Sequence, residues 1–268
     1  MTHDPDEDAT PIDTAHAAME AQPDNGAARL RFYERLADAE LFLMLTEEAL
    51  DDNVSPELFE TEEGRFVLVF DREHRLSRFA ERPAPYAAMS GRILAEMLRG
   101  QEIGLGLNLG VAPSAILIPP AAMDWLCDTL GHAPQETEAR IAEFTAPRGL
   151  PEDLITAIDT KLATAVGLAR SAYLVGTTDA QGGRGHLLGF VDAMEPAQGA
   201  LAKAASEALT FSGIEAGAMD VGFFTSDDPV TAQLAAVGLR FDLPEPAKPE
   251  PLFQEAPGSD PAKPPILK

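Results

Sequence analysis

Side chains that could do covalent chemistry are scattered along this sequence. The one cysteine, Cys127, lies between Asp124 and Asp128 on an apolar helical pattern. A reactive thiolate is favoured by positive neighbours, so we expect a buried and inert thiol. The Gly-x-Ser-x-Gly sequence typical of many serine hydrolases does not occur. We therefore predict no catalytic residues and a protein that is not an enzyme.

The histidines do not indicate a metal site. Zinc ligands usually occur as local pairs of histidine or cysteine that converge on the ion. No histidine has a second one at the i, i+4 spacing or a cysteine partner among His3, His16, His74, His132 and His186. We expect no bound metal and no cofactor.

Two glycine clusters superficially suggest phosphate binding. Gly104, Gly106 and Gly110 resemble part of a dinucleotide-binding loop, but the third glycine comes one residue late. A further strand pattern follows, where such a loop needs a helix N-terminus. The second cluster, residues 182–185, lacks the Lys-Ser/Thr pair of a Walker loop. We predict a strand with a tight turn for the first cluster and a hairpin turn for the second.

Adjacent acidic residues do not form catalytic pairs here. Neighbours in sequence point in different directions on a helix or a strand. Asp227 and Asp228 precede Pro229, so we expect them to cap a helix and stabilise its dipole. The other pairs lie in an acidic stretch that favours solubility: Glu47 and Glu48, Asp51 and Asp52, Glu62 and Glu63.

Charge excludes several classes of partner. The chain has 44 Asp and Glu against 20 Lys and Arg, a formal net charge of −24. Nucleic acids and anionic membranes attract basic surfaces, so we expect neither as a partner. A single cysteine excludes an internal disulfide. No run of about 18 apolar residues and no signal-like pattern is present, which predicts a soluble cytoplasmic protein.

Both ends differ from the middle of the chain. Residues 1–25 are acidic, contain no Lys or Arg, and predict a disordered arm. Residues 243–268 contain eight prolines and repeat Pro-Ala-Lys-Pro at 246–249 and 261–264, which predicts a flexible, extended tail. Two interpretations of this tail stay open. It either only solubilises the protein or docks a partner through Leu252 and Phe253.

The body between these ends mixes two hydrophobic periods. Apolar residues at three- and four-residue spacing predict helices over 27–38, 90–100, 119–131, 151–162, 197–211 and 229–238. Short apolar runs predict strands over 41–45, 66–70, 105–109, 115–118, 139–144, 173–175, 187–191, 220–225 and 239–243. The pattern predicts an α+β protein of two small mixed units side by side, at residues 26–132 and 133–242.

One family resemblance covers much of this body. The strand and charged segment at 66–79, the helix at 93–98 and the glycine-rich segment at 104–110 resemble the SseB N-terminal domain in the same order. Leu109 stands where the family usually has proline. The segments at 147–175 and 187–191 resemble an SseB C-terminal domain.

The resemblance implies a cytoplasmic bacterial protein of a family named for enhanced serine sensitivity, and it supplies no catalytic residues. A component of type III secretion carries the same name as this family. A secretion role does not follow from that name, because function must be argued from a site. Two hypotheses follow. The first is a non-enzymatic binding or regulatory protein with a protein partner. The second is an amino-acid sensor or an enzyme with a site between the two units. The oligomeric state is left open.

Overall fold

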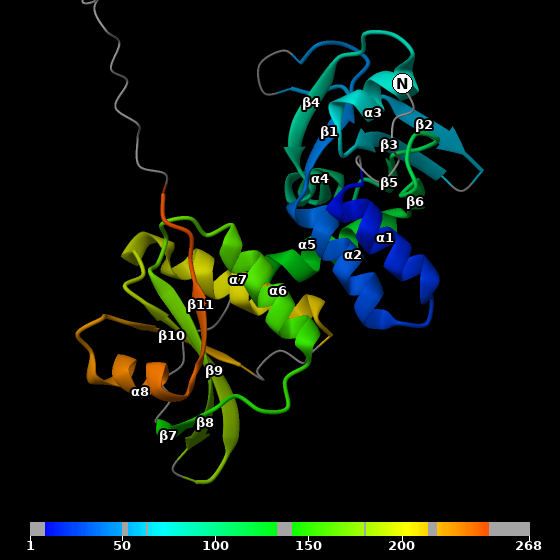
Figure 1. Cartoon of the computed structure of the whole chain (residues 1–268). Coiled ribbons are helices and arrows are strands. Elements are labelled where there is room, and N and C mark those ends of the chain that lie inside the picture. Colours follow the sequence, from blue (N-terminus) through cyan, green and yellow to red (C-terminus); the bar gives the residue numbers. More distant parts are fainter. Residues whose placement is uncertain are drawn as a thin grey trace, which may run out of the picture.

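The computed structural model folds the chain into two units, each built on its own β-sheet (Figure 1). It describes residues 9–49, 53–62, 64–132, 141–179, 181–213 and 219–246. One unit precedes residue 133 and the other follows residue 140. The predicted α+β class with two mixed units is thereby confirmed.

The first unit is a mixed sheet with helices on both of its faces. Its described helices are α1 (Pro11–Ala21), α2 (Gly26–Asp38), α3 (Glu73–Ala80), α4 (Gly91–Leu98) and α5 (Pro120–Gly131). Its strands are β1 (Glu40–Met44), β2 (Leu58–Thr61), β3 (Gly64–Phe70), β4 (Tyr86–Ser90), β5 (Ile103–Leu107) and β6 (Ile116–Ile118). The sheet order is β4-β1-β3-β5-β6, with β2 paired to β3, and only the β3–β5 pair is parallel among the described strands.

Strand β3 is buried on both faces, which explains its unbroken apolar run. Val67 and Val69 join the larger core with α1, α2, α4 and α5. Leu68 and Phe70 lie on the opposite face, where they cluster with Leu76 of α3. The sheet is therefore the middle layer of the first unit.

The second unit repeats this layering with a smaller sheet. Its described elements are β7 (Ile141–Thr145), α6 (Glu152–Ala163), β8 (Ser171–Asp179), β9 (Arg184–Val191), η1 (Glu195–Ala197), α7 (Gln198–Phe211), β10 (Asp220–Phe224), α8 (Pro229–Val237) and β11 (Leu239–Asp242). The sheet order is β10-β9-β8-β11, with β7 also paired to β8. The β9–β10 pair is parallel and the other described pairs are antiparallel.

Alternation along β8 divides the second unit into two apolar clusters. Ala172 and Leu174 belong to the cluster that also holds residues of α6 and α7. Tyr173 and Val175 belong to the other cluster, together with Leu234 of α8. Helices α6 and α7 thus cover one face of the sheet and α8 covers the other.

Aromatic side chains join the two units. Trp125 of α5 lies edge-on to Tyr33 of α2, with ring centroids 5.3 Å apart. On its other side it lies edge-on to Phe211 of α7, at 6.5 Å. Phe211 is buried and counts among the core residues of the first unit. The units therefore share apolar packing as well as polar contacts.

The predicted helix caps and turns are confirmed where the local sequence specifies them. Ser90 accepts a hydrogen bond from the Ile93 amide and begins α4. Of the two acids expected at the start of α8, Asp228 is the N-cap and accepts a hydrogen bond from the Val230 amide, whereas Asp227 precedes the cap. In the β8–β9 hairpin, the Asp179 carboxylate accepts hydrogen bonds from the amides of Gln181 and Gly183.

The first glycine cluster is a strand and a turn, as predicted. A Cβ on Gly104 would lie 2.5 Å from the carbonyl oxygen of Ile118, so only glycine allows β5 and β6 this approach. After β5, the chain turns through Asn108 and Gly110, which have φ angles of 49° and 68°.

Two predictions need correction. The arm predicted over residues 1–25 includes α1, which is helical because Ile12 and Ala15 are buried against the sheet. We predicted disorder from the acidic composition of this segment and gave its helical spacing of apolar residues no weight. Cys127 is half-buried at the edge of the first core, where we expected a fully buried thiol.

Some predicted features lie outside the described residues. They are residues 1–8 of the arm, the acidic pair at Asp51 and Asp52, Glu63, the start of the strand at 139–144, and residues 247–268 of the tail. The tail's first residues, 243–246, are described, and Leu243 is buried in the second unit.

Candidate functional site

A cleft of about 790 Å³ lies between the two units. The first unit lines it with the start of α1, the α2–β1 connection, the β3–α3 connection and the start of α4, and the second unit lines it with α6 and α7. Its apolar wall includes Ile12, Phe42, Leu168 and Leu201. We call this space the interdomain cleft.

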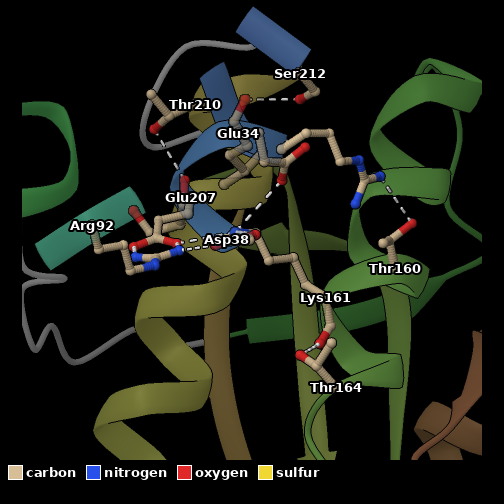
Figure 2. A network of polar contacts seen from close by, with 12 residues as sticks. Glu34, Asp38, Arg92, Thr160, Lys161, Thr164, Glu207, Thr210 and Ser212 are labelled. Carbon is tan, nitrogen blue, oxygen red and sulfur yellow. Dashed lines mark hydrogen bonds and ion pairs between the residues drawn. The ribbon is translucent and has the colours of Figure 1, made fainter. Parts of the chain in front are cut away.

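An ion-pair network borders the cleft and joins the two units. Figure 2 shows Lys161 of α6 reaching toward Asp38 and Glu34 of α2. Its Nζ lies 2.6 Å from Asp38 Oδ2, 3.2 Å from Glu207 Oε2 and 3.7 Å from Glu34 Oε1. Arg92 of α4 donates to both carboxylate oxygens of Glu207 at 2.6 Å, and it also donates to Asp38. These five residues form the interdomain network.

Burial and charge act against each other in this network. Burial would raise the pKa of Asp38, but Lys161 and Arg92 outweigh it and hold that pKa below its ordinary value. The same balance lowers the pKa of Glu207, where Arg92 contributes most of the compensation. A hydrogen bond to Glu207 raises the pKa of Arg92. Lys161 and Arg92 are therefore fully engaged in ion pairs that hold the two units together.

Glu34 is the exception in the network. It is buried, and its Oε1 has no hydrogen-bond partner among the described residues. Burial raises its pKa, and the attraction of Lys161, with smaller contributions from Arg35 and Arg31, only partly offsets this. Three carboxylates thus share two cations, and Glu34 is the one left under-compensated.

Two further cations that line the cleft, Arg72 and Lys203, have no carboxylate partner in the described part of the chain. Among the described residues they make no side-chain hydrogen bond or ion pair, whereas Arg35 donates to the Thr160 hydroxyl at 3.4 Å and attracts the Glu34 carboxylate. Of the two acids that line the cleft outside any ion pair, Glu73 is hydrogen-bonded to Tyr86, and Glu40 is the other. The lining holds five cations and five acids in all, so its total charge is balanced, and Arg72 and Lys203 are the cations left to attract an anion.

Three helices of the first unit begin at the cleft. Their N-cap residues, Thr10 for α1, Arg72 for α3 and Ser90 for α4, all line it. The positive end of a helix dipole favours anions. At α3, no side chain of the cap residue accepts a hydrogen bond from the helix. The helix ends therefore add local positive potential at these three points of the lining.

A second buried network fixes α1 at one side of the cleft. Arg75 of α3 donates to Asp13 of α1 at 2.6 Å and to Asp71 at 2.9 Å. Burial would raise the pKa of Asp13, but Arg75, Ser114 and the Thr10 amide outweigh it and lower the pKa to about 2. The network positions Thr10 and Asp71 where they line the cleft.

The residues considered for chemistry do not meet at this site. Cys127 and the glycine clusters lie elsewhere, and none of the histidines that the structure describes lines the cleft. Among the described residues, no group of three or more His, Cys, Asp or Glu is arranged to hold a metal ion. The network residues were not identified from sequence because they come from four different helices and form no local motif.

Comparison with known proteins supports the family resemblance for the first unit. Residues 14–125 match the family model described as the SseB protein N-terminal domain, from within α1 to within α5. The match does not extend over the second unit, so the SseB C-terminal domain stays a prediction. Searches of curated proteins and of solved structures found no match. No described helix has both the length and the apolar character that a membrane span requires.

Proposed function

We propose that this chain, whose residues 14–125 form an SseB N-terminal domain, is a non-enzymatic protein that binds a small anionic molecule in its interdomain cleft. The observation that carries the proposal is the placement of Arg72 and Lys203. They line an apolar-walled cleft and have no carboxylate partner among the described residues. A ligand with a carboxylate or phosphate group and an apolar part would complement both features.

The size of the cleft supports a small ligand. Pockets for small molecules usually enclose roughly 300–1,000 Å³, and this one encloses about 790 Å³. A cleft between two units also lets ligand binding change how the units are held, which suits a regulatory role. These points favour a metabolite over a protein partner at this site.

The chemistry of the lining favours holding a ligand over converting it. Lys161, Arg92, Asp38 and Glu207 are neutralised by one another in ion pairs. A general acid or base needs a pKa near the working pH, whereas the pKa values of Asp38 and Glu207 are lowered. The family's name, together with its expected bacterial cytoplasmic setting, makes amino acids the first ligands to test.

A thermal-shift screen tests the proposal. The full chain is heated with amino acids, dicarboxylates and phosphorylated metabolites, because a ligand bound only by the folded state raises the melting temperature. We expect a saturable rise with at least one anion. The rise should be lost in Arg72→Ala with Lys203→Ala and kept in Arg184→Ala, an exposed arginine of the β9 hairpin. No shift with any anion would overturn the proposal.

A further inference from the structure

The described end of the chain lies at the rim of the interdomain cleft. The Gly167 amide donates to the Pro244 carbonyl oxygen at 2.8 Å. Gly167 lies between Ala165 and Leu168, which both line the cleft. In Figure 1 the chain continues past β11, from orange to red, and reaches the upper left of the second unit.

Glycine at position 167 allows this approach. Its φ angle is +70°, and a Cβ there would lie 2.7 Å from Cγ of Pro246. Proline 246 therefore packs directly on the backbone beside the cleft. The remaining residues of the chain, 247–268, start from this fixed point.

The chain beyond Pro246 carries a short segment that complements the cleft. Residues 250–255 read Glu-Pro-Leu-Phe-Gln-Glu, two large apolar residues between two acids, with no Lys or Arg. The cleft presents the matching features, an apolar wall with the half-buried Phe42 and Leu168 and the cations Arg72 and Lys203, which have no partner among the described residues. Leu252 lies six positions after Pro246, and a proline-rich chain covers about 3 Å per residue. Leu252 can thus reach the cleft.

We propose that residues 250–255 occupy the interdomain cleft of their own chain. Leu252 and Phe253 contact the apolar wall, and Glu250 and Glu255 pair with the cleft cations. This proposal rests on the proposed function, because it uses the same cleft. It implies that residues 250–255 compete with the small anionic ligand for that cleft. Because a short tether gives an effective concentration on the order of millimolar, even a weak contact would be populated.

Photo-cross-linking in the full chain tests this placement. The photoreactive residue p-benzoylphenylalanine replaces Phe253, and the same residue at Ile266 serves as a control outside the proposed segment. After irradiation, peptide mass spectrometry identifies the attached residues. We expect monomeric product with the cross-link from position 253 on Phe42 or Leu168. Attachment outside the cleft, or no attachment, overturns the proposal.

Two variants and one mixing experiment sharpen the result. Replacing Arg72 and Lys203 by Glu in the full chain should lower the yield of the cleft cross-link about fivefold, whereas Arg184→Glu should not. Mixing isotope-labelled and unlabelled chains separates this product from one between two copies. A cross-link formed mainly between chains would also overturn the proposal.

The outcome is distinguishable from a failure of the proposed function. The cross-link needs no added ligand, so it can be found even if every compound in the thermal-shift screen fails. If a ligand is found, Leu252→Ser with Phe253→Ser should strengthen its binding several-fold, because the competing segment no longer fits. Unchanged affinity would contradict the competition.

Discussion

Lys161 lies 2.6 Å from Asp38, and this contact joins a helix of the second unit to a helix of the first. The Lys161 side chain is only 9% exposed and is also paired with Glu207 and Glu34. A buried lysine is retained only where carboxylates compensate its charge. The contact therefore makes the relative position of the two units depend on charge as well as on packing.

Removing this lysine should strongly destabilise the protein. In Lys161→Met the apolar volume is nearly kept, but three carboxylates are left with Arg92 alone. Breaking one side of a buried pair costs about 3–5 kcal/mol, which urea unfolding followed by circular dichroism would measure. As a matched control, Lys203→Met removes a lysine without an ion pair and should change stability by less than about 0.5 kcal/mol. Equal effects of the two substitutions would contradict this role of Lys161.

Glu34 should make the protein less stable as the pH rises. Its pKa is raised in the folded state, so the fold binds the proton more tightly than the unfolded chain does. This contribution is complete below the ordinary glutamate pKa and is lost as the pH rises through the raised value. Glu34→Gln should remove that loss and equal or exceed the wild type in stability at pH 8. Urea unfolding from pH 4 to 8 would show it, and a variant that is less stable at pH 8 would refute the prediction.

Asp13 should have the opposite pH dependence. Its folded pKa is about 2, below the ordinary value of 3.8. Its contribution is therefore present above pH 3.8 and is lost as the pH falls toward 2. Asp13→Asn should cost about 2 kcal/mol at neutral pH and less on acidification, as followed by chemical unfolding at each pH. A cost that does not change with pH would mean that its charge is not what stabilises α1.

The aromatic contact between the units can be measured directly. Trp125 and Phe211 are edge-on neighbours from different units. Such pairs contribute about 0.5–1.5 kcal/mol beyond their burial, so a double-mutant cycle with Trp125→Leu and Phe211→Leu should give a coupling of that size. Zero coupling would show that the rings only fill space at the interface.

Two glycines with similar backbone angles allow a matched test of the chain end. Gly149 and Gly167 have φ angles of +76° and +70°, but only Gly167 has Pro246 against it. Alanine at either position meets the same backbone penalty, about 1 kcal/mol. Gly167→Ala should in addition displace Pro246 and lower the cleft cross-link from position 253. If Gly149→Ala lowers it equally, the packing of Pro246 does not position the tail.

Much of the secondary structure followed from local sequence. The helix at Gly91–Leu98 begins where Ser90 can cap it, and the β8–β9 hairpin forms where glycines allow the turn. The unbroken apolar run in β3 predicted a buried strand correctly, because both faces of that strand are covered in the structure. Helix α1 was not identified, because its stability comes from packing on a sheet that is distant in sequence.

The amino-acid order by itself determined the α+β class, the two units, their caps and turns, and the resemblance of the first unit to the SseB N-terminal domain. Periodicity and capping act over three to eight residues, so they are visible in any short window. Only the tertiary structure decided that Lys161, from one unit, would meet Asp38 of the other beside an apolar cleft. Ion pairs depend on distance in space, and side chains more than a hundred positions apart carry no local mark of their partners.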